Sequence, residues 1–354
     1  MKKFLSSHTI LLKLHNNSEN IFISVFSLSL LLPAFLLFGD LKFNQKESFS
    51  KEGQRELKVY SKGLETKPDA WDLNSCLVTD YKYNGAYLAS EEPTGEKSST
   101  YMIDGISYVH PVVTAQYALF NFNNFFYNKD LQYFQEFIDT ANYLLHIQKP
   151  NGALEYGFEY KDYVSKTYFK PGWISCMAQG EVISVFARAF NMTKDYKYYE
   201  GAKKAYLFMF TSKENGGCLT TLEDLDSKYS KDIFLEEYIS YPKNHFTLNG
   251  YMFSMIGVYD FLKLTEEEGD NFQYLVKEDF HDLVNSLKIV LPYYDLANLS
   301  SYDLAHITMP EYRSYPDVSA KYHRVHICQL NLLFSITGDQ VIMKYRNKFV
   351  NYIL

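Results

Sequence analysis

Three pairs of apolar-periodic segments, each pair joined by a similar three-residue break, dominate the sequence after Pro111. The breaks are Asn128-Lys129-Asp130, Thr193-Lys194-Asp195 and Thr337-Gly338-Asp339. The aspartate at the end of each break can accept hydrogen bonds from the free backbone amides of a following helix. Repeated helix–turn–helix units of similar length predict stacked helical hairpins and a mainly α fold.

The apolar periodicity also gives the expected bounds of the helices. Paired helices are expected over Val112–Tyr127 with Leu131–Ile147, Ile174–Met192 with Tyr196–Phe210, and Tyr322–Ile336 with Val341–Ile353, and further helices over Phe246–Leu264 and Phe280–Leu291. From Trp71 to Tyr108 the runs shorten between glycines and prolines, which predicts loops or short strands packed on the main domain. The repeat alone suits an open solenoid as well as a closed ring of hairpins.

The N-terminal part contains an uncharged apolar run, Ile21–Phe38, with lysines before it and Asp40 after it. Such a run is about long enough for a bilayer core, which takes roughly 20 apolar residues. We expect a signal anchor in single-pass type II topology, with residues 1–20 cytoplasmic and the remainder lumenal or extracytoplasmic. Residues 39–70 would form a polar stalk before a folded domain over 71–354. A cleaved signal peptide and a buried helix stay open as alternatives.

Charge and composition exclude one class of partner and suggest another. The 354-residue chain has a formal net charge of −7 and no basic tract in its folded part, so a nucleic-acid partner is not expected. Aromatic residues make up 17% of the chain, with 32 tyrosines. Two interpretations stay open: a compositional bias that fills a helical core, or a carbohydrate groove in which aromatic faces stack on sugar rings.

The cysteines are widely spaced and form no C-x-x-C pair. A zinc site is therefore not expected, and no metal is predicted. Because free cysteine is among the most buried residue types, buried thiols are the favoured interpretation of Cys76, Cys176, Cys218 and Cys328. One disulfide stays open if the domain lies outside the cytosol.

Acid–base side chains gather in three motifs of the last third of the chain. The motifs are Glu236-Glu237-Tyr238, Tyr302-Asp303-Leu304-Ala305-His306, and Tyr322-His323 with His326 one turn later. Carboxylate, phenol and imidazole are groups with which enzymes move protons at carbon. The motifs come from separate loops or loop–helix junctions, and loops on a rigid scaffold usually carry catalytic groups. Together they predict an assembled cleft.

Two further motifs, Trp173–Gly180 (WISCMAQG) and Leu248-Asn249-Gly250, complete the pattern. In this order the motifs resemble those of the D-glucuronyl C5-epimerase family, over roughly Ser107 to Leu354. The resemblance implies an isomerase that inverts C5 of D-glucuronate to L-iduronate within a heparosan-like polysaccharide, without a cofactor. It also implies an (α/α) toroid, an acidic polysaccharide as substrate, a homodimer as in many of the enzymes it resembles, and a Golgi membrane in a eukaryote.

The resemblance implies catalytic roles for four residues. Glu237 matches the family's base, and Tyr322 matches the tyrosine that acts as acid on the opposite face of the sugar. Tyr238 and Tyr302 match the remaining tyrosines of the family's site and would position the uronate or share the acid role. Burial and the neighbouring Glu236 are expected to raise the pKa of Glu237, and neighbours are expected to lower the pKa of an acidic tyrosine. Without the resemblance, Glu237 would be interpreted as a solvated loop acid.

Substrate contacts are expected from a wider set of residues: Gly152, Gln179, Asn249, His306, His323, Arg324 and His326. For two of them another interpretation stays open, because Asn249 could cap a helix and His326 could be a hydrogen-bonded core histidine.

The family's pattern is altered at two arginines. Its Y-D-L-R-H stretch has Ala305 in place of the arginine, and its A-R-W-D-Y-H stretch reads Val318–His323 here, without arginine or tryptophan. Because guanidinium groups bind carboxylates well, Arg313, Lys321 and Arg324 are the candidates to replace them. Two alternatives to an epimerase stay open: a polysaccharide lyase, which shares the C5 proton abstraction, and a non-catalytic glycan-binding relative, which fits the lost arginines.

Overall fold

The computed structural model describes residues 80–88, 100–103 and 105–353, all within one unit of the chain. The predicted anchor over 21–38, the cytoplasmic segment before it and the stalk after it lie outside the described residues. Within the described part, no helix combines the length and the apolar character that a bilayer-spanning segment needs.

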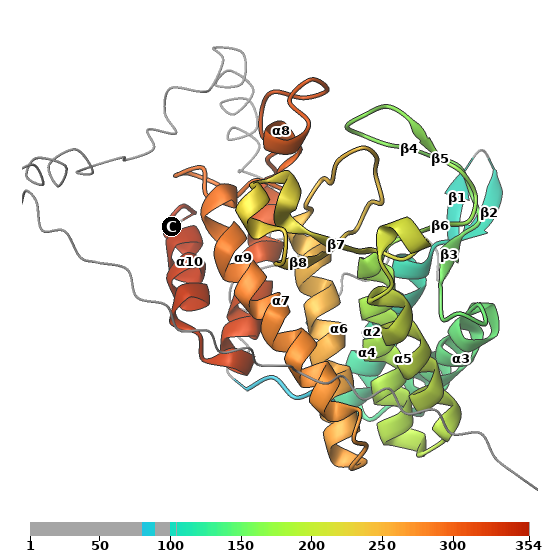
Figure 1. Cartoon of the computed structure of the whole chain (residues 1–354). Helices are drawn as coiled ribbons and strands as arrows, with labels where there is room; N and C mark the ends of the chain where they lie inside the picture. Colours follow the sequence, from blue (N-terminus) through green and yellow to red (C-terminus); the bar gives the residue numbers. More distant parts are fainter. Residues whose placement is uncertain (1–79, 89–99, 104, 354) are drawn as a thin grey trace, which may run out of the picture. The chain divides into compact units, whose positions relative to one another are not determined.

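Helical hairpins form the body of this unit, as Figure 1 shows. In the described part of the chain the pairs are α2 (Pro111–Asn128) with α3 (Leu131–Ile147), α4 (Cys176–Thr193) with α5 (Tyr196–Met209), α6 (Leu248–Glu267) with α7 (Gln273–Tyr294), and α9 (Ala320–Thr337) with α10 (Gln340–Val350). A one-turn helix, α8 (Ala305–Thr308), precedes the last pair. The predicted helices and the mainly α fold are confirmed. The largest difference is at α7, which begins at Gln273 instead of Phe280.

The three-residue breaks act as predicted. The carboxylate that ends each break caps the next helix: Asp130 accepts from the backbone amide of Gln132, and Asp195 and Asp339 do the same for α5 and α10. The middle residue of each break is left-handed and closes the preceding helix, with φ of 59°, 54° and 64° at Lys129, Lys194 and Gly338. Each pair is therefore joined by a tight turn, which makes its helices antiparallel neighbours.

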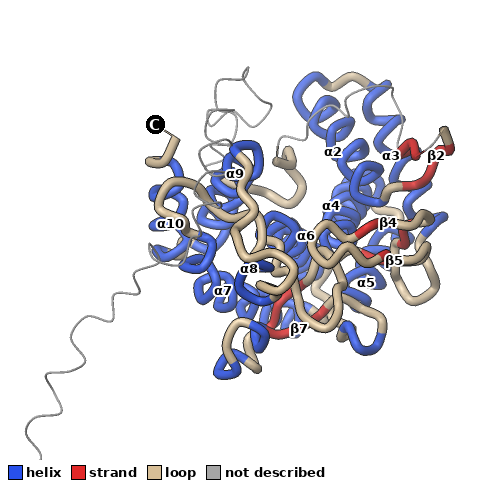
Figure 2. Tube along the Cα trace, turned by 90° about the horizontal axis from the view of Figure 1, so that it is seen from above, coloured by secondary structure: helices blue, strands red, loops and turns tan. Residues whose placement is uncertain are grey.

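The first helix of each hairpin belongs to an inner row and the second to an outer row. α4 packs against α2 and α6, and α6 packs against α9, whereas α3, α5, α7 and α10 pack mainly on their own partners. Seen from above in Figure 2, α4 and α6 lie at the centre of the unit. α4 is accordingly buried without interruption from Cys176 to Phe190.

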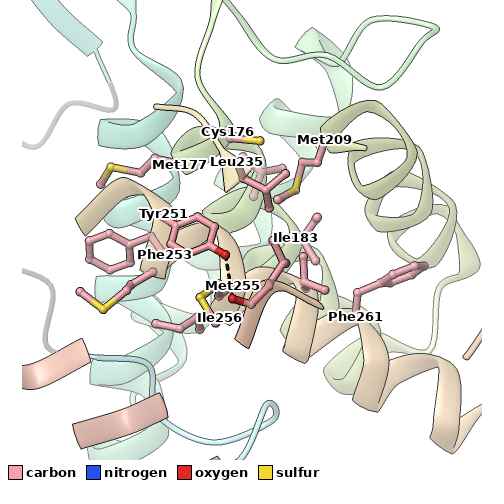
Figure 3. Packing of buried hydrophobic residues seen from close by; sticks show 14 of the residues in the cluster. Cys176, Met177, Ile183, Met209, Leu235, Tyr251, Phe253, Met255, Ile256 and Phe261 are labelled. Atoms are coloured by element: carbon pink, nitrogen blue, oxygen red, sulfur yellow. Dashed lines mark hydrogen bonds between the residues drawn. The ribbon is translucent and has the colours of Figure 1, made fainter. Parts of the chain in front are cut away.

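α4 and α6 cross closely because each presents a glycine to the other. A Cβ atom on Gly180 would lie 2.6 Å from the Cα atom of Ser254, and one on Gly257 would lie 2.3 Å from the Gly180 carbonyl oxygen. Buried apolar side chains such as Ile183 of α4 and Met255 of α6 pack around this crossing (Figure 3). The crossing fixes the two helices whose N-terminal turns carry part of the site described below.

Short antiparallel strand pairs occupy the connections at one end of the helices (Figure 1). The pairs are β1 (Thr100–Ile103) with β2 (Ile106–Val109), β3 (Glu155–Tyr156) with β6 (Trp173–Ile174), β4 (Tyr160–Lys161) with β5 (Tyr168–Phe169), and β7 (Leu219–Thr221) with β8 (Ile233–Leu235). The β1–β2 hairpin confirms the strands predicted before residue 108. The others were not predicted, because strands of two or three residues leave no alternating pattern to detect.

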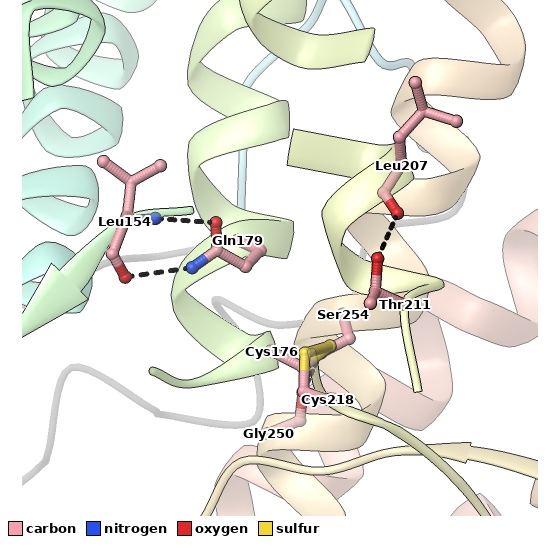
Figure 4. The surroundings of a disulfide bond; sticks show 8 residues. All are labelled: Leu154, Cys176, Gln179, Leu207, Thr211, Cys218, Gly250 and Ser254. Atoms are coloured by element: carbon pink, nitrogen blue, oxygen red, sulfur yellow. Dashed lines mark hydrogen bonds between the residues drawn. A yellow bond between two sulfur atoms is a disulfide. The ribbon is translucent and has the colours of Figure 1, made fainter. Parts of the chain in front are cut away.

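The favoured interpretation of the cysteines as buried thiols is wrong. Cys176 and Cys218 form a disulfide (Figure 4), and Cys328 is disulfide-bonded as well. The bond links the first residue of α4 to the residue before β7. Sequence spacing gives no sign of it, because pairing depends on the separation of the Cα atoms in the folded chain, here 5.8 Å across 42 positions.

A buried ion pair ties α4 to α6. Arg188 and Asp260 lie 2.8 Å apart with side chains 0% exposed. The Tyr81 hydroxyl donates to Asp260 and accepts from Arg188, and the Gly85 carbonyl accepts from Arg188, which attaches residues 80–88 to both helices.

Replacing Arg188 by methionine leaves the Asp260 carboxylate buried and unpaired, so we expect a loss of about 3–5 kcal/mol in the free energy of unfolding. Urea denaturation measures it. Lys197→Met removes an exposed pair with Asp195 and is the control, with no resolvable change expected, because solvent screens exposed ion pairs. Equal effects of the two substitutions would contradict a structural role for the buried pair.

Candidate active site

A cavity of about 310 Å³ lies where the N-terminal turns of the inner helices meet. Val112, Met177, Asn249 and Tyr322 line it from the first turns of α2, α4, α6 and α9, respectively. The rest of the wall includes Tyr87 and Leu88 of the 80–88 segment, residues of β3, β4 and β6, and the segment after β8, which carries Glu237 and Tyr238. The cavity therefore brings together four of the predicted site residues: Glu237, Tyr238, Asn249 and Tyr322.

Backbone hydrogen bonds fix the segment that carries Glu237. The amide of Glu236 donates to the Cys218 carbonyl, and the amide of Cys176 donates to the Glu236 carbonyl, both over 3.0 Å. Gly250 of α6 makes room for the carboxylate, since a Cβ atom there would lie 2.3 Å from Glu237 Oε2. The glycine of the L-N-G motif is therefore explained by packing, because a side chain at this position would collide with the carboxylate of Glu237.

Burial controls the charge of Glu237. Its side chain is 7% exposed, and its Oε2 atom has no hydrogen-bond partner among the described residues. Burial raises the pKa of Glu237 to about 8, with a further contribution from Asp303 and an opposing one from Tyr238. A carboxyl group with that pKa is a base poised near neutral pH.

Glu236 has the same raised pKa as Glu237, but its side chain does not line the cavity. Burial raises the pKa of Glu236 to about 8, while its Oε1 atom accepts from the backbone amide of Phe246 over 3.0 Å. The expected mutual repulsion of the two carboxylates is a minor factor, because burial is the main cause of both pKa shifts. Glu236 therefore supports the loop, and Glu237 faces the cavity.

The site tyrosines are held as phenols. Burial and the field of Glu237 raise the pKa of Tyr322 to about 12, and burial raises the pKa values of Tyr238 and Tyr302 well above their usual range. The predicted lowering of a tyrosine pKa is thus wrong, because desolvation outweighs the neighbours. Tyr302 lies behind the cavity wall, with its ring centroid 4.4 Å from that of Tyr322. These phenols carry a proton that they can donate.

Aromatic rings form one wall of the cavity. Tyr156 and Trp173 stack with centroids 3.7 Å apart and planes 10° from parallel. Tyr160 continues the stack at 5.3 Å from Trp173 and faces Tyr238 at 5.9 Å. These rings give one part of the lining an aromatic surface. Trp173 stands in the W-I-S-C-M-A-Q-G motif, which was the available signal for this wall.

Asn249 and Lys321 offer polar contacts to the cavity. Asn249 is 3% exposed, and its Oδ1 atom has no hydrogen-bond partner within the described part. The N-cap position of α6 is Thr247, so the capping interpretation of Asn249 is wrong. Lys321 supplies a cationic side chain to the described lining.

The other two candidate cations lie elsewhere. Arg313 pairs with Asp303 and, over 3.5 Å, with Asp317, and it does not line the cavity. The Tyr163 hydroxyl also donates to Asp303, which makes this cluster a support behind Tyr302. Arg324 is half-buried on α9 and is also outside the lining.

Of the motif histidines, His323 and His326 lie in the core, and His306 is partly exposed on α8. The Ser300 amide donates to His323 Nδ1 over 2.9 Å, His323 Nε2 donates to the Phe349 carbonyl, and the Ser300 hydroxyl contacts His326 Nδ1. Burial lowers the pKa values of His306 and His323 to about 4 and that of His326 further, so all three are neutral. None of them lines the cavity.

Gln179 and Gly152 also have structural partners. The Gln179 amide bonds to both the amide and the carbonyl of Leu154, as Figure 4 shows. Gly152 has φ +97°, and a Cβ atom there would lie 2.1 Å from the Lys204 carbonyl oxygen. Hydrogen bonds to Leu154 thus account for Gln179, and close packing against Lys204 accounts for Gly152, without a substrate contact.

Glu181 was missed by the sequence analysis. It follows the W-I-S-C-M-A-Q-G motif directly, is 0% exposed on α4 and lines the cavity. An acidic residue inside an uninterrupted buried stretch was the signal that could have found it. Within the described residues, no group of three or more His, Cys, Asp or Glu side chains is arranged to hold a metal ion.

The Cys176–Cys218 disulfide stands next to the loop of Glu237. Replacing Cys218 by serine should lower the free energy of unfolding by about 2–4 kcal/mol and should lower kcat, because the strand before Glu237 loses its tether to α4. Thermal unfolding and turnover measured below the new Tm check both parts. Full activity of a destabilised variant would show that the backbone hydrogen bonds alone position Glu237.

Comparisons with known proteins agree with this geometry. The chain matches the family model described as "D-glucuronyl C5-epimerase C-terminus" over residues 148–351. It is 32% identical over 228 residues to the D-glucuronyl C5-epimerase of Caenorhabditis elegans, covering 62% of this chain and 35% of that protein. It is 28% identical over 196 residues to an uncharacterised protein of Methanocaldococcus jannaschii, covering 55% of this chain and 56% of the relative.

The matched parts thus span about a third and just over half of those relatives. The matched residues include the segments that carry Glu237, Asn249 and Tyr322 and the aromatic wall. On this ground the chain belongs to the D-glucuronyl C5-epimerase family, which supports an epimerase function.

Proposed function

We propose that this protein inverts C5 of D-glucuronate to L-iduronate within a heparosan-like polysaccharide, without a cofactor. One observation carries the proposal: a carboxyl group with a pKa of about 8 and a phenol with a pKa of about 12, Glu237 and Tyr322, line one cavity. Membership of the family supports the reaction class. The inner helices around the cavity are also what an (α/α) toroid would provide, and we include that architecture in the proposal.

In the proposed reaction Glu237, as carboxylate, removes the C5 proton of glucuronate. The electron pair of the broken C–H bond moves into the sugar carboxylate, which becomes an enolate-like dianion. Tyr322 then gives its phenolic proton to C5 from the opposite face, and the bond pair returns to carbon. Glu237 ends as the acid and Tyr322 as the phenolate, and proton exchange with solvent restores both.

Neighbouring groups would stabilise the dianion. Tyr238 and Asn249 can donate to the developing charge, and Lys321 supplies the cation that the lost arginines would otherwise provide. Tyr302, against the ring of Tyr322, would hold that phenol in place. The aromatic wall would bind the sugar faces.

The test is incubation of the purified protein with heparosan in deuterated water. Deuterium at C5 with intact chains is the expected result. Absorbance from an unsaturated uronate would instead identify a polysaccharide lyase. Binding without either signal would identify a non-catalytic glycan-binding protein and overturn the proposal.

We further propose that residues 21–38 anchor the protein in type II topology, with the domain on the lumenal or extracytoplasmic side. The Cys176–Cys218 disulfide supports this side, since structural disulfides persist in oxidising compartments. A homodimer stays a prediction. Protease protection of the domain in sealed membrane vesicles tests the topology, and digestion from the cytoplasmic side would contradict it.

A further inference from the structure

The proposed reaction leaves one end of the cavity unexplained. Glu181 and Gln116 line that end from α4 and α2, and Tyr87 lines it from the 80–88 segment. Glu237 and Tyr322 belong instead to the side of α6 and α9. Tyr156 also lines the cavity, and the fields of Glu237 and Glu181 both act on it.

Two buried polar atoms at this end lack a partner within the described part of the chain. They are the Oε2 atom of Glu181, whose side chain is 0% exposed, and the hydroxyl of Tyr87, which is 5% exposed. The other carboxyl oxygen of Glu181 accepts from Gln116 over 3.0 Å. Buried polar groups normally have a hydrogen-bond partner, so an unpaired pair lining a cavity points to a ligand.

Among the residues that the structure describes, no cation contributes to the pKa shift of the Glu181 carboxyl group. The nearest guanidinium on its helix, Arg188, is engaged by Asp260, Tyr81 and the Gly85 carbonyl. Burial raises the pKa of Glu181 well above its usual range, and the field of Glu237 adds to the shift, while Gln116 opposes it. Burial thus favours the protonated form of Glu181, in which the carboxyl group can donate a hydrogen bond.

We propose that Glu181, Gln116 and Tyr87 form a subsite for a neutral hydrogen-bonding group, a hydroxyl or an amide, of the sugar next to the reacting uronate. Glu181 donates from its protonated carboxyl to an acceptor oxygen, and the Tyr87 hydroxyl completes the contact. A sulfate group would be disfavoured, because the cation in the described lining is Lys321 on α9, at the other side of the cavity. This proposal rests on the proposed function only for the identity of the sugar.

Apart from Glu237, the ionisable groups in the lining near Glu181 are held in their neutral forms. From the 80–88 segment Tyr87 faces it, from β3 Tyr156, and from the loop after β8 Glu237. Burial holds both phenols in the protonated form. On the α2 side His110, which also lines the cavity, is neutral because burial lowers its pKa to about 4. Glu237, whose pKa is about 8, ionises in the same pH range and acts on binding in every variant, so Glu181 is followed through the difference between the wild type and Glu181→Gln at each pH.

The experiment compares the full chain with Glu181→Gln, Glu181→Ala and Tyr87→Phe, using an N-acetylated heparosan hexasaccharide. KM from deuterium exchange and Kd from calorimetry are measured between pH 6 and 9. In the wild type both should be lowest at pH 6, where the protonated donor form of Glu181 is most populated. In Glu181→Gln both should be about threefold higher at pH 6 and should rise less with pH than in the wild type, because the amide keeps a donor at all pH values.

Glu181→Ala should raise Kd about tenfold at pH 6, as expected for the loss of a buried hydrogen bond, with kcat changed by less than about threefold. Tyr87→Phe should raise Kd by several-fold and keep the wild-type pH dependence. The exposed Glu200 on α5 provides the charge-matched control, since Glu200→Gln should leave KM and its pH dependence unchanged. Unfolding curves identify any variant that is not folded, and the conservative glutamine variant then decides.

Three outcomes overturn the subsite. The first is an alanine variant that binds like the wild type. The second is a glutamine variant that loses kcat while Kd is unchanged, which would place Glu181 in proton transfer. The third is tighter binding of an N-sulfated hexasaccharide than of the N-acetylated one. Because Kd does not depend on turnover, wild-type binding with no exchange would refute the proposed function and leave the subsite intact.

Discussion

Glu237→Gln should abolish deuterium exchange at C5, with a loss in rate of at least about 10³-fold. General bases contribute typically about 10²–10⁴-fold, and an amide in the same place cannot accept the proton. Proton NMR of heparosan in deuterated water measures the exchange. Exchange at the wild-type rate would refute the assignment of Glu237 as the base.

The pH dependence gives a second readout of the same group. Since the pKa of Glu237 lies at about 8, kcat/KM of the wild type should rise with pH up to about 8 and then level off. The low-pH limb reports the fraction of Glu237 that has lost its proton. If the midpoint of this rise lay near the usual pKa of a carboxyl group, Glu237 would not be desolvated when it acts as the base.

The same shift has a consequence for stability, with a fixed sign. Because the pKa of Glu237 is higher in the folded than in the unfolded state, ionisation of this group lowers the free energy of unfolding as pH rises from about 4.5 to about 8. Glutamine does not ionise, so the variant escapes this loss. The free energy of unfolding of Glu237→Gln minus that of the wild type should therefore be about 2–3 kcal/mol larger at pH 7 than at pH 4. Urea denaturation at the two pH values measures the difference.

The chain contains a matched control in Glu236. Its pKa is raised to the same value by burial, but its carboxyl group accepts from Phe246 instead of facing the cavity. Glu236→Gln should show a similar gain in stability and keep at least about a tenth of the exchange rate. A loss of exchange equal to that of Glu237→Gln would mean that the two carboxyl groups act as one unit.

The sequence was sufficient for the helices and insufficient for the charges of the site. The Asp130 and Asp195 caps and the periodic runs between them are local features, so their positions follow from the order of residues. The pKa of Tyr322 was predicted with the wrong sign, because desolvation depends on what surrounds the ring in three dimensions. The same holds for the pKa of Glu181, whose rise depends on what surrounds the side chain in the folded chain.

Motif membership was also an incomplete guide to position. Tyr322 and His323 are adjacent in the sequence, yet one lines the cavity and the other bonds Ser300 and Phe349 in the core. Neighbours on a helix point about 100° apart, so only one of them can face a given site. Glu236 and Glu237, just after β8, divide in the same way: one accepts from Phe246 and the other lines the cavity.

Tyr322→Phe separates the two halves of the proposed reaction. Without the phenol, C5 cannot be protonated from the opposite face, so inversion should fall by about 10²–10⁴-fold. Glu237 can still remove the proton of glucuronate and return a solvent-derived one to the same face. We therefore expect deuterium at C5 of residues that remain glucuronate, at a reduced rate. An iduronate-containing substrate should show no exchange, because its C5 proton faces the missing group.

Tyr302→Phe is the control variant for Tyr322→Phe. Tyr302 lies within 4.4 Å of the Tyr322 ring but outside the cavity lining, so its loss should slow exchange and inversion together. Proton NMR gives the deuterium content of glucuronate and iduronate separately, and their ratio distinguishes the two variants. Near-normal inversion by Tyr322→Phe would exclude Tyr322 as the acid. Exchange from iduronate but not from glucuronate would reverse the faces assigned to Glu237 and Tyr322, because each residue can reach only the proton on its own side of C5.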